Sequence, residues 1–363
     1  MAITINTTFN SIHLTSSLPE EVSITTDQES LEVSVLVNSS KVFSSVYYPY
    51  NQEIIVRDIR SIVESYMSGA QRNIATLKIE AKGAETIKET VTYDDDGNIH
   101  VSYGSDTSSP TVVSSDDITV IYCRFSTILS SEAFLSRHFL TTVRSALIPR
   151  SGSMKLSFFA TTNEASSISA RIYFSQLANP SLILSLDCDL GETPSDYDSI
   201  SSKILSHAYL KTLVDRAMHF SCKVHGAEYR VGNRQFNLFF TDEQPCDTFH
   251  FLNAFNHLDT AYLFASTTTK TEIDHSEAVC GHYTQFYDES VNVKHEVETA
   301  PLTPQEASWL SEMLSSKYVT RQIDSFTSAR VLISDITSEV TDSDKDLIRL
   351  KFSWKYADGT ERL

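Results

Sequence analysis

Glycine is scarce in this chain, with 10 glycines among 363 residues. Phosphate-binding loops need several glycines close together, because backbone N–H groups must approach the phosphate without side chains in the way. The sequence contains neither a Walker loop nor a Gly-x-Gly-x-x-Gly pattern. It also lacks the Gly-x-Ser-x-Gly pattern of serine hydrolases, to which Arg150–Ser153 is only superficially similar. These common forms of phosphate binding and nucleophilic catalysis are therefore not expected.

Basic side chains are in the minority. The chain has 29 Lys and Arg against 47 Asp and Glu, a formal net charge of −18. Nucleic-acid binding depends on neutralising phosphates, so a chain this acidic needs a segregated basic patch to bind DNA or RNA. The densest basic stretch, Lys345–Lys355, is interleaved with Asp and apolar residues. An anionic membrane surface is disfavoured for the same reason. We expect neither nucleic acid nor a membrane as a partner.

Long hydrophobic runs and a disulfide pattern are missing too. No window approaches 18 apolar residues, and Met1–Asn6 lacks the basic segment, apolar core and cleavage site of a signal peptide. The cysteines are odd in number and far apart: Cys123, Cys188, Cys222, Cys246 and Cys280. Most lie in apolar, strand-like runs. Buried thiols, in a protein made in a reducing cytoplasm, are predicted rather than a disulfide framework.

The residues that are abundant favour strands. Tyr and Phe number 16 and 19, and hydrophobic residues make up 41% of the chain; these types suit pleated, half-buried surfaces. Leu31–Val37 alternates with period two, as a strand with one buried face does. The turn Asp94–Asn98 is flanked by alternating segments and predicts a hairpin. We therefore predict a mainly β fold of two or three β-sandwich-like domains.

Two short amphipathic helices interrupt the strands. The first is expected to begin after Asp58 as N-cap, with Ile59, Ile62, Val63, Tyr66 and Met67 on one stripe closed by Gly69. The second is expected near 304–316, because Thr303–Glu306 combines an N-cap, a Pro at the first position and the Glu of a capping box. The predicted domains are an N-terminal β-sandwich at 1–150, a middle β-sandwich at 151–244, and a C-terminal β-rich domain at 245–363 that holds this second helix.

Two acidic stretches were weighed as calcium loops. Asp94–Asn98 is rich in oxygen ligands, but a hairpin turn accounts for every residue in it. The second stretch consists of Asp187, Asp189, Glu192, Asp196 and Asp198. Solvated loop charge is the plainer interpretation of this stretch. No cofactor is predicted.

Zinc, sugar binding and glycoside hydrolysis were weighed in the same way. Zinc ligand types gather in one region, at Cys246, His250, His275, Cys280 and His282, without a Cys-x-x-Cys or a close His pair. Aromatic residues at 47–50 and 236–240 could stack on sugars, although such residues more often pack in a core or between subunits. A pair of carboxylates on distant strands would escape detection. We predict no catalytic and no metal residues, and the binding residues stay unknown.

Several stretches resemble proteins of tailed phages and prophages of Bacteroidetes. The segments that carry this resemblance are Val42–Ile59, Phe249–Asn256 with Thr269, Lys270, Val297–Thr303 and Trp309, and Val331–Thr337 with Leu350–Asp358. Such proteins are tail or baseplate components, β-rich and assembled in several copies. The resemblance implies a non-enzymatic structural protein of the virion, made in the host cytoplasm, which forms a homo-oligomeric ring or tube and contacts other tail proteins. The alternative is a carbohydrate- or receptor-binding adhesin, and after it a polysaccharide hydrolase.

Overall fold

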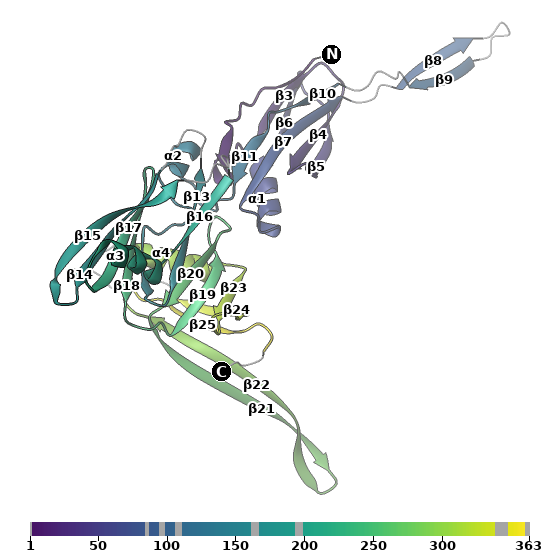
Figure 1. Cartoon of the computed structure of the whole chain (residues 1–363). Coiled ribbons are helices and arrows are strands. Elements are labelled where there is room, and N and C mark those ends of the chain that lie inside the picture. The colour runs from purple at the N-terminus through teal and green to yellow at the C-terminus, as the bar shows by residue number, and fades with distance from the viewer. Residues whose placement is uncertain are drawn as a thin grey trace. The chain divides into compact units, whose positions relative to one another are not determined.

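The chain is mainly β, as the sequence predicted. The computed structural model describes residues 2–83, 87–93, 99–105, 111–160, 167–192, 199–337 and 348–359. Its residues fall into two compact units, Met1–Glu132 and Ala133–Leu363. Figure 1 labels the strands and helices of both units.

Two sheets build the first unit. Sheet I has the strand order β1 (Ile3–Ile5), β3 (Val22–Thr26), β6 (Glu53–Val56). Sheet II has the order β2 (Ile12–Leu14), β11 (Ile118–Ile121), β7 (Ile74–Gly83), β4 (Leu31–Val37), β5 (Ser40–Tyr47), and β10 (Val112–Ser114) also pairs with β7. A short 3₁₀ turn, η1 (Thr15–Ser17), follows β2. The parallel pairing of β2 with β11 joins the two ends of the unit.

One core holds the two sheets of the first unit together. The inward residues of β4 alternate as the sequence predicted, and Val33, Val35 and Val37 are fully buried. They share a cluster with side chains of sheet I and with helix α1 (Ile59–Gly69). The predicted helix is therefore confirmed, and the unit is sandwich-like. The predicted cap is wrong, because the Asp58 side chain makes no capping hydrogen bond and its backbone φ is 62°.

A separate hairpin, β8 (Ile87–Tyr93) with β9 (Ile99–Ser105), pairs in antiparallel register from Ile87 with Ser105 to Tyr93 with Ile99. The predicted hairpin is thus present in its strands. Its turn, the calcium candidate Asp94–Asn98, lies outside the described residues.

Three sheets build the second unit. Sheet III has the order β12 (Ser145–Pro149), β18 (Arg234–Thr241), β17 (Cys222–Val231), β14 (Ser167–Gln176), β15 (Asn179–Glu192). Sheet IV pairs β13 (Ser153–Ala160) with β16 (Ser199–Ser206). Sheet V has the order β20 (Leu258–Leu263), β19 (Asp247–Leu252), β23 (Val319–Gln322), β24 (Ser328–Thr337), β25 (Lys351–Tyr356), β22 (Tyr283–Thr299), β21 (Ala265–Cys280).

Helices α2 (Ser131–Leu135), α3 (His207–Ala217) and α4 (Pro304–Ser315) complete this part of the chain. The helix predicted near 304–316 is confirmed with its capping box: the Thr303 hydroxyl accepts from the Glu306 N–H, and the Glu306 carboxylate accepts from the Thr303 N–H at 2.9 Å. Helix α3 was not predicted. Its Ser206 hydroxyl accepts a hydrogen bond from the Tyr209 N–H, and Leu210 and Val214 are buried.

The units differ from the three predicted domains. The expected boundary at 150 falls between β12 and β13, yet β12 pairs in parallel with β18 and belongs to the second unit. Residues of the predicted domains 151–244 and 245–363 share one hydrophobic cluster, in which Phe236 and Phe251 are both fully buried. Sheets III and V therefore complete a common core and do not form separate domains.

Candidate functional site

Two of the acidic candidates, Asp187 and Asp189, are occupied by internal bonds. Asp187 accepts two hydrogen bonds from the Arg171 guanidinium, at 2.7 and 3.3 Å. Asp189 accepts a hydrogen bond from the Gly191 N–H at 2.9 Å. Residues 193–198, with Asp196 and Asp198, lie outside the described residues. Asp187 and Asp189 thus serve to brace β15.

The zinc candidates are not brought together. Cys246 lies directly before β19 and His250 lies on it. His275 and Cys280 lie on β21, and His282 lies in the turn that follows β21. His250 is hydrogen-bonded to Thr260 at 2.9 Å, and the His275 ring stacks on Phe286. Within the described ranges there is no group of three His, Cys, Asp or Glu that could hold a metal ion.

The predicted burial of the cysteines holds for two of them. Cys123 and Cys222 are buried, and Cys188 is half-buried. Cys246 and Cys280 are exposed, which the sequence did not indicate. None of the described cysteines is joined in a disulfide.

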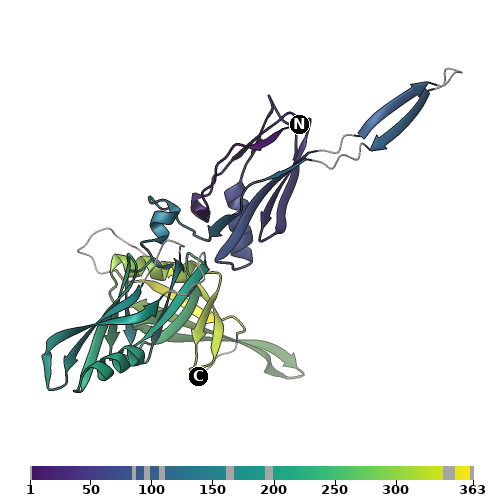
Figure 2. The same cartoon turned by 45° about the horizontal axis from the view of Figure 1, so that its top comes forward.

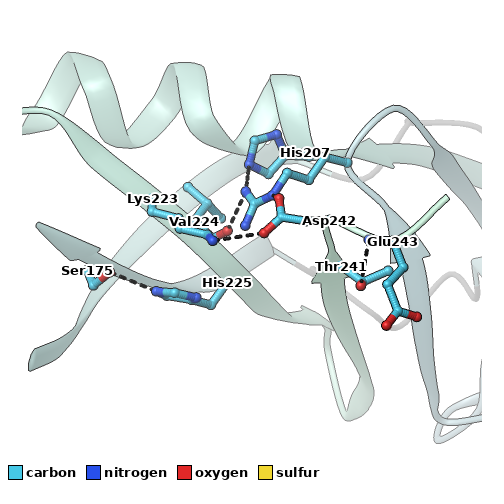
Figure 3. A network of polar contacts seen from close by, with 9 residues as sticks. Ser175, His207, Lys223, Val224, His225, Thr241, Asp242 and Glu243 are labelled. Carbon is cyan, nitrogen blue, oxygen red and sulfur yellow. Dashed lines mark hydrogen bonds and ion pairs between the residues drawn. The ribbon is translucent and has the colours of Figure 1, made fainter. Parts of the chain in front are cut away.

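A polar network surrounds Arg150, the residue that opened the superficial serine-hydrolase pattern (Figure 3). The Arg150 guanidinium bonds the Val224 carbonyl at 3.0 Å, His207 at 2.6 Å and the Asp242 carboxylate. Lys223 bonds the same carboxylate at 2.9 Å, and hydrogen bonds from Lys223 and Arg150 lower the pKa of Asp242. The network fastens the turn after β12 to β17, β18 and α3, which is a structural role.

Beside it, His225 is hydrogen-bonded to the Ser175 hydroxyl at 2.8 Å. His225 occupies a β-bulge, since Tyr173 pairs with Gly226 and Phe174 pairs with Val224. A serine next to a histidine is two-thirds of a nucleophilic triad. Ser175, however, is fully buried in the core, so its hydroxyl is out of reach of a substrate.

A buried polar group ties α4 to β20. The Asp259 carboxylate accepts hydrogen bonds from the Trp309 indole N–H at 3.0 Å and the Thr141 hydroxyl at 3.1 Å. Burial raises the pKa of Asp259 to about 6. Burial, helped by the charge of Lys155, lowers the pKa of the nearby His257 to about 4. Both pKa shifts are caused by burial in the core. We therefore interpret them as effects on stability.

A cavity of about 200 Å³ lies among β12, β20 and α4, with Leu147, Tyr262 and Trp309 in its lining. Ligand clefts usually measure about 300–1,000 Å³. This cavity is therefore too small for a typical organic ligand.

The aromatic candidates divide into two groups. Phe236 and Phe240 point into the core of the second unit, whereas Phe239 between them is 52% exposed. Tyr48 and Tyr50, in the first unit, are 79% and 80% exposed. Exposed tyrosines on a turn can contact a sugar or a protein.

The most distinctive surface of the second unit is the hairpin of β21 and β22. These strands pair from Ala265 with Thr299 to Cys280 with Tyr283, with a register shift between Ser276 and Glu277 that leaves Tyr287 as the extra residue of a β-bulge. β22 also pairs with β25, over His295–Glu298. Farther out, in the part of the chain that the structure describes, the two strands pair with each other alone. Figures 1 and 2 show them running out together in green. We call residues 271–293 the arm.

Turn chemistry closes the arm. Gly281 and His282 separate the paired residues Cys280 and Tyr283, so the hairpin has a two-residue loop. Such loops require a left-handed residue, and Gly281 supplies it with a φ of 68°.

Strand alternation gives the arm two different faces. Residues directly opposite each other point to the same side, and neighbours along a strand point to opposite sides. The arm's first face carries Thr271, Ile273, His275, Glu277 and Val279 from β21, with Thr284, Phe286, Glu289, Val291 and Val293 from β22. The stacking of His275 on Phe286, with ring centroids 4.4 Å apart, places both on this side. We call it the apolar face.

The apolar face continues a surface that is buried nearer the body. On β22 the next residues of the same face are His295 and Val297, which are 7% and 3% exposed. His295 stacks on Trp354 of β25 with ring centroids 3.9 Å apart, and Val297 belongs to the core cluster. Farther out, Val291 and Phe286 are 49% and 62% exposed. The face of β22 that packs on the core at its base thus continues into solvent along the arm, where it still carries apolar side chains such as Val291 and Phe286.

The opposite face is polar. It carries Glu272, Asp274, Ser276, Ala278 and Cys280 from β21, with Tyr283, Gln285, Asp288, Ser290 and Asn292 from β22. The arm contains five acidic residues and neither Lys nor Arg. At its base, Lys294 forms an ion pair with Asp335. The arm is therefore an acidic ribbon that gathers Ile273, Val279, Phe286, Val291 and Val293 on one side, together with two of its five carboxylates, Glu277 and Glu289.

No protein-family model matches the chain, and no curated protein is found to be similar to it. Among the described residues, no helix has the length and apolar character needed to cross a membrane. The sequence did not single out the arm. Its signal was present in the alternation of Val291, Val293, His295 and Val297.

Proposed function

We propose that this protein is a non-enzymatic structural component of a phage tail or baseplate, which assembles in several copies through symmetric contacts. Its location would be the virion, with other tail proteins as neighbours. The resemblance to tail proteins supports this proposal; in the second unit the segments that carry it lie mainly on strands of sheet V, and in the first unit the segment is Val42–Ile59. The observation that carries it is the apolar face of the arm.

Exposed apolar surface in one contiguous strip is the usual mark of a protein contact. The four most apolar positions of the strip, Ile273, Val279, Phe286 and Val291, are between 49% and 74% exposed. Leaving them in water costs roughly 25 cal/mol per Å² of apolar area, and nothing in the described parts of this chain covers them. A partner that does so gains this free energy, which makes assembly the best-supported role.

The negative charge of the arm disfavours some classes of partner. The arm's five carboxylates disfavour nucleic acid and anionic lipid, which leaves protein as the favoured contact. The polar groups of the second unit described above are engaged in bonds within the chain. The balance of observations supports an assembly protein over an enzyme.

The test is the state of the purified full-length chain over a wide concentration range. Light scattering coupled to size exclusion, with electron microscopy of the same fractions, should show oligomers of defined copy number. A strictly monomeric chain at the highest concentration, without particles on the grid, would contradict the proposal.

A second candidate is the carbohydrate- or receptor-binding adhesin. The observation that favours it is the exposure of Tyr48 and Tyr50 on the turn between β5 and β6. A glycan array separates the two functions, because an assembly protein should bind no glycan. Binding that disappears in a Tyr48→Ala, Tyr50→Ala double variant would favour the adhesin.

A further inference from the structure

The arm presents a twisted strip, two strands wide, with exposed apolar side chains on one face, and a partner that covers this face must follow its twist. Ten residue pairs separate Thr271 from Cys280 along β21 and their partners on β22. At about 3.3 Å per residue the strip is roughly 30 Å long, and two strands make it about 10 Å wide. Extended sheets cover such faces by packing another sheet on them, about 10 Å away.

We infer that the apolar faces of the arms of two copies of this chain pack against each other, related by a two-fold axis. The inference rests on the proposed function and names the partner of the same surface. A second copy supplies a face with the same length, width and spacing of apolar side chains. In a two-fold contact, if residue i of one copy contacts residue j of the other, then residue j of the first copy contacts residue i of the second. The face must therefore be complementary to itself.

The charges favour packing through the apolar face over packing through the polar face. Face-to-face packing turns Glu272, Asp274 and Asp288 away from the contact and into water. The charged groups on the apolar face itself are Glu277 and Glu289, with His275 directly opposite Glu289 in the register. Packing through the polar face would bring six carboxylates of two copies together, against four for packing through the apolar face, so like-charge repulsion opposes it more strongly.

The area of the contact indicates how strongly two arms can bind each other. Two strips of roughly 30 by 10 Å cover roughly 600 Å² in projection, about half of the smallest total area that stable complexes bury. One arm pair is therefore a weak contact. It gains strength when several copies are held together, because the second contact is then intramolecular. This matches a role in a multi-copy particle.

The test uses two adjacent residues that face opposite ways. In the full-length chain with Cys246→Ser and Cys280→Ser, which removes both exposed thiols, Val291→Cys places a thiol on the apolar face and Ser290→Cys places one on the polar face. Each oligomeric protein is treated with a flexible bifunctional maleimide and analysed on a denaturing gel. We expect covalent dimers with Val291→Cys and at least ten-fold fewer with Ser290→Cys.

Several outcomes would overturn the inference. Equal linking of both variants would mean that the apolar face does not select the contact. Oligomers without linking of Val291→Cys would leave the proposed function standing and refute the pairing of arms. A strictly monomeric chain would refute both.

A second variant removes the arm. Replacing residues 273–291 by Asn-Gly joins Glu272 to Asn292, which lie opposite each other in the register, through a favoured two-residue turn. If arms pair with arms, this shortened chain should assemble more weakly than the full-length chain at the same concentration. Equal assembly of the two chains would show that the arm is not a contact between copies and would overturn the inference.

Discussion

The two ends of β22 share one strand and one alternating pattern, but they meet different surroundings. At the base, His295 and Val297 are covered by Trp354 and the core of the second unit. Along the arm, Val291 and Val293 occupy equivalent positions, and Val291 is half exposed. The alternating pattern of a strand therefore predicts which of its faces is apolar. It does not predict whether that face packs against the same chain or against another one.

The largest difference between base and arm is expected in the stability of the isolated chain. Trp354→Ala should lower the free energy of unfolding by about 3–5 kcal/mol, because it leaves a cavity among packed side chains. Phe286→Ala, an aromatic truncation in the same sheet, should change it by less than about 0.5 kcal/mol. Urea unfolding of dilute protein measures both. Similar losses in the two variants would mean that the arm is packed after all.

Buried titratable groups sharpen the comparison through pH. The raised pKa of Asp259, about 6 when folded, means that its favourable contribution is present below about pH 4 and is lost as pH rises through 6. The lowered pKa of His257, about 4, means that its contribution is present above about pH 6.5 and is lost as pH falls toward 4. In the native chain the two contributions oppose each other over this interval.

Single variants separate them. With Asp259→Asn, stability should rise by on the order of 3 kcal/mol between pH 4 and 6.5. With His257→Asn, it should instead fall by a similar amount over the same interval. Unfolding in urea at a series of pH values gives the slopes. Neutralising an arm carboxylate, as in Asp274→Asn, is the control and should leave the slope of the native chain unchanged. Parallel profiles for the two core variants would contradict the assignment.

A smaller effect is expected at the helix caps. Thr303→Ala removes the hydroxyl that accepts from the Glu306 N–H at the start of α4, and it should cost about 1 kcal/mol. Asp58→Asn at the start of α1 should cost less than about 0.5 kcal/mol, because no capping hydrogen bond is lost there. Thermal unfolding followed by circular dichroism ranks the two. A larger loss at Asp58 would contradict the structure.

The smallest effect on folding is expected on the arm itself. Val291→Asp and Ser290→Asp should each change the unfolding free energy of the dilute chain by less than about 0.5 kcal/mol. At high concentration they should diverge: Val291→Asp puts a charge into the apolar contact and should weaken assembly, whereas Ser290→Asp should not. Light scattering against concentration measures the difference. Equal assembly of the two variants would remove the distinction between the faces.

Local chemistry explains which elements the sequence predicted. The alternation of Leu31–Val37 and the capping box at Thr303 act within a few residues, and both were confirmed. Helix α3 was not predicted from the sequence, because its buried stripe consists only of Leu210 and Val214. The parallel pairing of β12 with β18 depends on residues far apart in the chain, and no local pattern encodes it.

The candidate sites show the same limit. Cys246 and His275 are close enough in the sequence to suggest a common metal site, but the hairpin carries His275 out along β21. The sequence did not single out the arm, because the Thr- and acid-rich segment at its start, 266–274, lacks the apolar residues of a buried strand. Burial depends on what surrounds a segment, and the arm's surroundings are not encoded within it.

The edge strand β12 has a consequence for how the chain is made. Its partner residues on β18 are translated 92 residues later, since Ser145 pairs with Asn237. Until that segment leaves the ribosome, Leu147 and Ile148 have no β18 to pair with. Long-range pairings of this kind also form slowly. Nascent chains that end before Thr241 should therefore depend on chaperones more than the finished protein does.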